Sequence, residues 1–270
     1  VNTFRKAKFS RRFLHRVFYH PRLKKMSIVV ERNVHNDVPD RVYDEFTSPY
    51  SIYVAKRFAK RWRTQLARAS RKFRVDKEVL VAILLVETGF GKVLGKYPVA
   101  GIYSSIIVEN RRQQRLFGKK KNLSAKKKYE LKRLREKAIW AKKELTALLR
   151  ILKKTKHTPL YFKGSYAGAF GIPQFLPSSY LKWGYDSDKN GSVNLYLFPD
   201  AIHSVANYLK AHGWKKGLYR KSNKKVIWAY NRSSAYVNTI LKVARQIRRK
   251  GGSTVAAAAV KRGKKSSRKQ

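Results

Sequence analysis

The chain has 270 residues, of which 64 are Lys or Arg and only 15 are Asp or Glu, so its formal net charge is +49. Such a charge attracts polyanions in general: nucleic acid, anionic lipid and acidic wall polymers. A hydrophobic content of 43%, with 16 Tyr and 5 Trp, excludes a wholly disordered polycation. The absence of cysteine excludes disulfides, thiolate zinc sites and cysteine nucleophiles.

Residues 1–48 are predicted to form a basic N-terminal arm. The first 25 residues contain nine Lys or Arg and no acid, interleaved with Phe, Leu and Tyr, so we expect partial helix there at most. The chain begins with Val rather than Met, which suggests a processed product that has lost a secretory signal. No stretch approaches the roughly 18 uncharged apolar residues of a transmembrane helix. We therefore expect a periplasmic or secreted protein.

The next segments show apolar residues at helical spacing. Residues 49–70 predict one helix with Arg and Lys on its outer face. Asp76 is placed to cap a second helix from Lys77 to Glu87, which Gly89 would end. Residues 111–135 form a Lys-rich insertion whose first part lacks any pattern, and residues from Tyr129 on predict a long amphipathic helix.

The second half of the chain changes character. Residues 164–180 carry no charge and are dense in Gly, Ala, Ser and Pro, which predicts tight turns. Helices are expected over 199–212 and 233–249, and the basic tail 250–270 should be disordered. No multi-strand sheet is indicated. The fold class is therefore mainly α, with a folded domain over 49–249.

Glu87 ends the most apolar run of the chain, "VLVAILLVETGFG". On a helix its side chain lies over Ile83 and Leu84, and apolar surroundings disfavour ionisation of a carboxyl group. A carboxyl that keeps its proton near neutral pH can act as a general acid. The alternative is a structural carboxylate, hydrogen-bonded to backbone or paired with Arg.

Two further segments are typical of carbohydrate binding. The uncharged loop offers hydroxyl, amide and aromatic groups, which suit a sugar polymer better than phosphates; its candidates are Ser165, Tyr166, Gln174, Ser178, Ser179 and Tyr180. The stretch "WAYNRSSAYV" adds Trp228, Tyr230, Asn231 and Tyr236. The alternatives are a packed structural loop and a cluster of core aromatics.

Four motifs in order, "VETGFGKVLGKY", "KGSYAGAFGIPQFLPSSY", "SVANYLKAHGW" and "IWAYNRSSAYV", resemble the membrane-bound lytic transglycosylase B family, glycoside hydrolase family 103, whose fold is lysozyme-like. The resemblance covers about residues 49–108 and 145–248. It implies that Glu87 is the single catalytic acid and that Ser165, Gln174, Tyr230, Asn231 and Tyr236 line a glycan cleft.

The resemblance also implies a reaction and a partner. A lytic transglycosylase cleaves the MurNAc-GlcNAc β-1,4 bond of peptidoglycan strands, with one Glu acting as acid and then as base, and leaves a 1,6-anhydromuramoyl end. Ordinary glycosidases use two carboxylates, whereas here the muramoyl 6-hydroxyl replaces the second one. No cofactor is required for this chemistry, and we expect a monomer.

The stretch "DSDKNGSVNLYLFPD" matches the first half of a calcium-binding loop. Asp186, Asp188 and Asn190 stand at alternate positions, Gly191 follows for the turn, and Ser192 comes next. The twelfth position is Leu197 rather than Glu. The resembled family closes its shortened loop with a later acid, and Asp200 stands at the matching place. A plain Asx-rich turn is the alternative.

The basic insertion and termini have no counterpart in the resembled family. They are either solvated surface or a means of retention on an anionic wall or membrane surface, and nonspecific binding of nucleic acid is compatible with their charge. Two other functions stay open at this point. One is a hydrolytic muramidase on the same fold, and the other is a noncatalytic protein that binds polyanions such as nucleic acid or wall polymers.

Overall fold

The computed structural model describes residues 4, 7, 9–35, 40–120, 122–218 and 220–249. The described residues form two compact units: those within 4–35 and 93–182, and those within 40–92 and 183–249. The domain expected over 49–249 includes parts of both units and stays a prediction. The predicted disordered tail, 250–270, lies outside the described residues.

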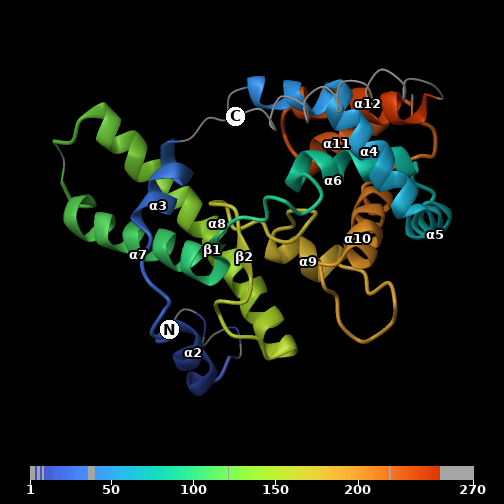
Figure 1. Cartoon of the computed structure of the whole chain (residues 1–270). Coiled ribbons are helices and arrows are strands. Elements are labelled where there is room, and N and C mark those ends of the chain that lie inside the picture. Colours follow the sequence, from blue (N-terminus) through green and yellow to red (C-terminus); the bar gives the residue numbers. More distant parts are fainter. Residues whose placement is uncertain are drawn as a thin grey trace, which may run out of the picture. The chain divides into compact units, whose positions relative to one another are not determined.

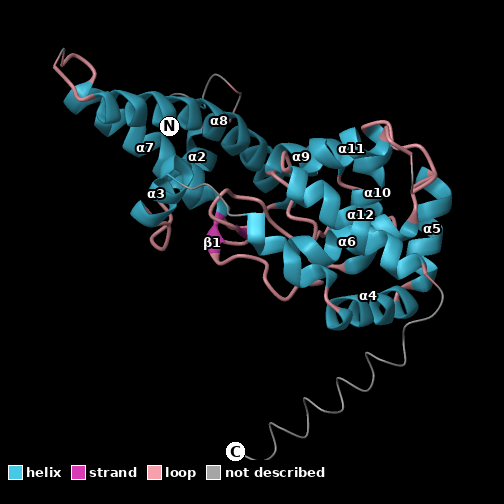
Figure 2. Cartoon of the chain, turned by 90° about the horizontal axis from the view of Figure 1, so that it is seen from above, coloured by secondary structure: helices cyan, strands magenta, loops and turns pink. Residues whose placement is uncertain are grey.

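The first unit is built on a long helical hairpin. Its members are α2 (Arg11–Phe18), α3 (Ser27–His35), β1 (Tyr97–Pro98), α7 (Val99–Phe117), α8 (Ala125–Thr155), β2 (Lys163–Gly164) and α9 (Pro177–Trp183). The helices α7 and α8 pack against each other (Figure 2), and α3 packs against both. The strands β1 and β2 form one short antiparallel pair. Much of the Lys-rich insertion therefore extends two packed helices.

The N-terminal arm is more ordered than the sequence indicated. The side chain of Ser10 accepts a hydrogen bond from the Phe13 amide and so caps α2, on which Leu14 and Val17 are buried. In α3 the side-chain amide of Asn33 donates to the Tyr166 carbonyl at 2.8 Å. Within residues 1–25 the described helix is α2, so the expectation of partial helix there is confirmed. The helix α3 was not predicted, and its buried residues Val29, Val30 and Val34 join the core.

The uncharged loop follows β2 and is held against α7. The hydroxyl of Tyr103, a fully buried residue of α7, donates to the carbonyls of Ala167 and Gly168. Gly168 has a φ of +79°, and a Cβ there would collide with the Tyr103 hydroxyl. The glycine is thus required both by backbone conformation and by close approach.

The second unit consists almost entirely of helices. They are η1 (Asp40–Thr47), α4 (Pro49–Arg61), α5 (Arg63–Phe73), α6 (Lys77–Thr88), α10 (Phe198–Ala211), α11 (Asn223–Tyr230) and α12 (Ser234–Arg248). In the middle of this unit, α6 packs against α4, α5, α10 and α12 (Figure 1). Every residue from Val79 to Leu85 is buried, so the apolar run of the sequence is the core of the unit.

One local expectation is wrong and a second is confirmed only in part. The helix expected over 49–70 is broken at Trp62, which caps the end of α4 and precedes α5. Asp76 precedes α6 as predicted but its side chain makes no capping bond. Its carboxylate instead accepts hydrogen bonds from the Trp214 indole, the Gly217 amide and the Arg248 guanidinium. A buried carboxylate with three donors is a tertiary link rather than a cap.

The described part of the chain contains no helix with the length and apolar character needed to cross a membrane.

Candidate functional site

Glu87 occupies the last turn of α6, where the buried run meets a sharp change of direction. The helix ends at Gly89, which has a φ of +56° and whose amide bonds back to the carbonyls of Leu84 and Leu85. Phe90 also has a positive φ, +61°, and its ring stacks on Phe58 with centroids 4.0 Å apart. This stacking helps to hold a conformation that non-glycine residues rarely adopt. The turn therefore fixes the end of the helix that carries Glu87.

The carboxyl group of Glu87 has a raised pKa. Loss of hydration by burial raises the pKa from 4.5 to about 7, and the hydrogen bond from Tyr236 opposes that rise. The Tyr236 hydroxyl donates to Glu87 Oε1 at 2.6 Å. A carboxyl with a pKa near neutrality can both give and take a proton at physiological pH. The apolar setting expected for Glu87 is present.

Tyr236, which contacts this carboxyl, belongs to a cluster of tyrosine rings within the second unit. Tyr236, in the first turn of α12, lies parallel to Tyr230 with centroids 6.4 Å apart, and Tyr43 meets its ring edge-on at 5.9 Å. Tyr230 contacts Tyr208 at 4.8 Å. Burial and the nearby Glu87 raise the pKa of both Tyr230 and Tyr236, so both hydroxyls stay protonated and can donate hydrogen bonds.

Asn231 stands between the two predicted tyrosines. It is the residue after α11, in an extended conformation, and is partly exposed. Its backbone joins α11 to the start of α12, where the Ser233 side chain accepts from the Tyr236 amide. Tyr230, Asn231 and Tyr236 thus lie in one short segment, from the end of α11 to the first turn of α12. Of the three, Tyr236 donates the hydrogen bond to Glu87.

Sequence reasoning missed Tyr43 and Tyr208. Tyr43 lies in η1 and packs on Tyr236, which is far from it in the sequence, so no local pattern could have indicated that contact. Tyr208 was within a motif, "SVANYLKAHGW", but its role was not foreseen. Its hydroxyl donates to the Ala229 carbonyl at 2.7 Å and fixes the end of α11, next to Tyr230.

The remaining candidates for glycan binding lie in the first unit. Ser165 is partly exposed and its carbonyl accepts from Gly168 in a tight turn. Gln174 has a φ of +49°, and its side-chain amide donates to the Gly171 carbonyl at 2.9 Å and to the Leu94 carbonyl at 3.4 Å. Both residues are thus held by backbone contacts of the loop.

Tyr166 and Tyr180 differ from each other in exposure. Tyr166 is partly exposed and its carbonyl accepts from Asn33. Tyr180, on α9, is 9% exposed and packs against Phe162 and Phe170. Its place in the structure is therefore that of an aromatic core residue.

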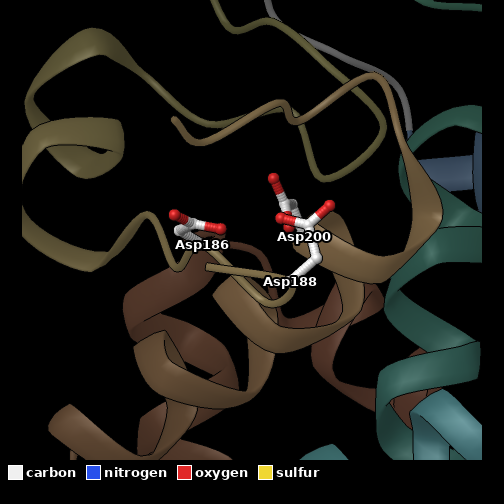
Figure 3. A group of neighbouring side chains, drawn as sticks. All are labelled: Asp186, Asp188 and Asp200. Atoms are coloured by element: carbon white, nitrogen blue, oxygen red, sulfur yellow. The ribbon is translucent and has the colours of Figure 1, made fainter. Parts of the chain in front are cut away.

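The carboxylates predicted to bind calcium do gather in the second unit. Ligand oxygens of Asp186, Asp188 and Asp200 lie within 4.8 Å of one another (Figure 3). Calcium is bound at 2.3–2.6 Å by six to eight oxygens, so one ion could reach all three groups. Asp200 is buried at the start of α10, and Asp188 is exposed.

The loop around these carboxylates is already ordered by its own hydrogen bonds. Asp186 accepts from the amides of Asn190 and Gly191, and the side-chain oxygen of Asn190 accepts from the amide and hydroxyl of Ser192. Asp200 accepts from the Ser187 amide and hydroxyl and from the Asn194 amide. The donor set, all oxygen, fits a hard cation, and the same bonds would also serve an Asx-rich turn.

Comparison with known proteins gives a consistent result. Residues 2–221 match the family described as Transglycosylase SLT domain. The chain is 32% identical over 177 residues to membrane-bound lytic murein transglycosylase B of Escherichia coli strain K12. The aligned residues make up 66% of this chain and 42% of that relative. The chain thus spans less than half the length of that relative.

Solved structures resemble the fold. SltB3 from Pseudomonas aeruginosa, in complex with NAG-anhNAM-pentapeptide, has a TM-score of 0.75 at 20% identity, over 93% of this chain and 79% of that one. The Escherichia coli lytic transglycosylase Slt35, in complex with calcium, has a TM-score of 0.72 at 23% identity, over 91% and 90%. The expectation of a mainly helical, lysozyme-like fold is confirmed.

Proposed function

Because the chain belongs to the Transglycosylase SLT domain family, we propose that it is a peptidoglycan lytic transglycosylase that cleaves the MurNAc-GlcNAc β-1,4 bond and leaves 1,6-anhydromuramoyl ends. The observation that carries the proposal is the carboxyl group of Glu87. It has a pKa raised to about 7 by burial and is held by the Tyr236 hydroxyl at 2.6 Å. That is the state required of a single group that must act first as an acid and then as a base.

In the proposed reaction the proton of Glu87 passes to the glycosidic oxygen as the bond from that oxygen to the muramoyl C1 breaks. The developing positive charge on the sugar is then next to a carboxylate, which favours it. Glu87 next removes the proton of the muramoyl 6-hydroxyl, whose oxygen bonds to C1. The proton count closes without water, and Glu87 returns to its starting state.

We propose that Tyr230, Asn231 and Tyr236 hold the sugar near Glu87. Tyr230 and Asn231 are partly exposed and offer a ring face and an amide. Tyr236 is 1% exposed, so its part is to orient Glu87 rather than to stack on a sugar. In the first unit, Ser165, Tyr166 and Gln174 are proposed to contact the glycan, whereas Tyr180 is buried against Phe162 and Phe170 and serves in packing.

Calcium is proposed as a structural ion. Asp186, Asp188 and Asp200 would hold it, with Asn190 and Ser192 supplying neutral oxygens, and the bound ion would supply positive charge that offsets three clustered carboxylates. The complex of the similar Slt35 with calcium supports this assignment. The ion would tie the 186–194 loop to the start of α10, in which Asp200 is already buried.

Action on peptidoglycan requires a periplasmic or secreted enzyme, which we take to be a monomer. The net charge of +49 supports an additional electrostatic association with an anionic wall polymer, a membrane surface or a nucleic acid. Such an association should weaken as salt rises.

The test of the function is digestion of purified sacculi followed by mass analysis of the released muropeptides. Wild type should release anhydro ends, and Glu87→Gln should release none while keeping its helical circular dichroism. Glu78→Gln, on the same helix but paired with Arg248, is the matched control and should stay active. Reducing muramic ends would establish a hydrolytic muramidase instead, and no release of muropeptides by wild type would point to a noncatalytic polyanion binder.

A further inference from the structure

The hairpin of α7 and α8 carries far more positive charge than its own carboxylates can neutralise. Residues 115–137 contain 11 Lys or Arg and two acids, Glu130 and Glu136. Among the described cations of this stretch, the ion pair is that of Lys127 with Glu130, at 3.5 Å. Unneutralised charge at this density creates a strong positive potential, which draws a polyanion to the hairpin.

A hollow on the side of α8 gathers part of this charge beside aromatic rings. Its volume is about 520 Å³. Three cations, two aromatic residues and one carboxylate line it: Lys132, Arg133, Lys137, Tyr129, Trp140 and Glu136. We call these six residues the α8 face. Tyr129 and Trp140 lie at its two ends, about 16 Å apart along the helix axis at 1.5 Å per residue, and the cations lie between them.

Contacts within the α8 face join each aromatic ring to a cation. Arg133 Nη1 donates to the Tyr129 hydroxyl at 3.0 Å. The ammonium of Lys137 stands 5.4 Å from the centre of the Trp140 ring, and the edge of that ring meets Tyr103 of the core. Tyr129 is 58% exposed. The rings are thus presented on a rigid helix with positive charge next to each of them.

The two central cations of the α8 face are poorly compensated. Burial, together with the charge of Arg133, lowers the pKa of Lys137. A phosphate group placed between Arg133 and Lys137 would relieve this repulsion, since Arg offers a fork of donors that suits phosphate oxygens. The hairpin end repeats the pattern: the ammonium groups of Lys120 and Lys127 stand 5.4 Å and 4.8 Å from the Phe117 ring.

We propose that the α8 face binds single-stranded nucleic acid, with phosphates on Arg133 and Lys137 and bases stacked on Tyr129 and Trp140. Cations interleaved with exposed aromatic rings are the combination by which proteins hold single strands without reading sequence. The proposal goes beyond the glycan chemistry of Glu87 and does not depend on it.

The arrangement fits a lipid surface less well. A helix that binds a membrane presents a continuous apolar face opposite its charges. The apolar face of α8 is buried against the rest of the unit through Leu131, Leu134, Ala138, Ala141 and Leu145. What α8 leaves exposed is mainly cations and rings, with Ile139 as a single exposed aliphatic side chain, which is less than a continuous apolar face.

The test measures binding of a fluorescein-labelled oligothymidylate of about 20 nucleotides by anisotropy at several salt concentrations. Three full-length proteins are compared: wild type, the double variant Arg133→Gln/Lys137→Gln, and the control double variant Lys128→Gln/Arg135→Gln. The second pair removes the same charge from exposed positions of α8 outside the hollow. We expect the first pair to weaken binding about tenfold and to flatten the salt dependence, and the control pair to change both much less.

A second comparison separates stacking from charge. Tyr129→Ala should weaken binding of the oligothymidylate about fivefold to tenfold and leave binding of inorganic polyphosphate unchanged. The proposal would be overturned if the two charge-removing double variants lost equal affinity for the oligothymidylate, or if Tyr129→Ala bound the oligothymidylate as tightly as wild type. Binding to phosphatidylglycerol vesicles that needs Arg133 and Lys137, without binding of the oligothymidylate, would assign the face to a membrane. Thermal melts of each variant show whether the helix is intact.

Discussion

The hydroxyl of Tyr236 donates a 2.6 Å hydrogen bond to Oε1 of Glu87 and so links the start of α12 to the end of α6. The bond stabilises the ionised carboxylate, whereas burial of the carboxyl disfavours it, and the balance sets the pKa of Glu87 at about 7. A weaker bond or a drier site would each raise the pKa further and make Glu87 a weaker acid. The proton affinity of Glu87 is therefore a property of two helices.

Tyr236→Phe should shift the pH dependence of the reaction. Loss of the hydroxyl removes the interaction that lowers the pKa of Glu87, so the pKa rises and the protonated acid persists to higher pH. The alkaline limb of the rate profile, near pH 7 in wild type, should move upward, as measured by muropeptide release from sacculi. Tyr208→Phe is the control, because its hydroxyl bonds to the Ala229 carbonyl. A limb that stays in place would show that Glu87 does not govern it.

Glu87→Gln should alter stability in a pH-dependent way. The folded-state pKa is raised from 4.5 to about 7, so ionised Glu87 disfavours folding. The protonated form of Glu87 contributes to the free energy of unfolding. This contribution is complete below pH 4.5 and is lost as pH rises through about 7, and the loss amounts to about 3 kcal/mol at most. Relative to wild type, the variant should therefore gain stability in urea melts between pH 5 and pH 8. Parallel curves for the two proteins would contradict the raised pKa.

Calcium should raise the melting temperature of the wild-type protein. An ion that binds only the folded state adds about 2.7 kcal/mol at 100 times its Kd. Asp188→Asn should reduce that gain and barely alter the melting temperature in a chelator, because Asp188 is exposed and bonds only within its own turn. Magnesium serves as the control cation. If calcium raised the melting temperature of the variant as much as that of wild type, the three carboxylates would not form a calcium site, and the segment would be a plain Asx-rich turn.

Asp76→Ala should destabilise the second unit by about 2–4 kcal/mol, since it strips three donors of a buried acceptor, including the Arg248 guanidinium at 2.6 Å. Glu78→Gln removes only the more exposed partner of Arg248 and should cost less than about 1 kcal/mol. Chemical denaturation of the two variants gives the comparison. Similar losses for both would mean that the Trp214 and Gly217 bonds contribute little.

The sequence predicted α10 and α12 with close bounds, because Pro199, Gly213 and Ser233 mark their ends by local chemistry. It also placed Glu87 on an apolar helix. It did not predict α9 or α11. The break at Trp62 and the helix α3 were not predictable, since both lie where the chain packs against distant segments: Trp62 contacts Phe198, and Asn33 of α3 bonds to Tyr166. Local propensity gives way to tertiary contacts at such places.

The residues of the candidate site could likewise be predicted only where the signal lay within one segment of the sequence. Tyr230 and Asn231 could be found within one motif, and the loop carboxylates could be found by their alternate spacing. The edge contact of Tyr43 on Tyr236 and the bond from Tyr208 to the Ala229 carbonyl could not, because each joins helices that the sequence does not show to be neighbours. The core position of Tyr180 likewise depends on Phe162 and Phe170.

The burial of α6 has a consequence for how long the acid stays in place. Amide hydrogens in a helix covered on every side exchange with solvent only when the whole unit opens, whereas those of an exposed loop exchange through small local openings. Glu87 is attached to the first kind of segment, and Asp186 and Asp188 to the second. The proton donor should thus keep its position for as long as the second unit stays folded, while the acidic loop opens and closes many times.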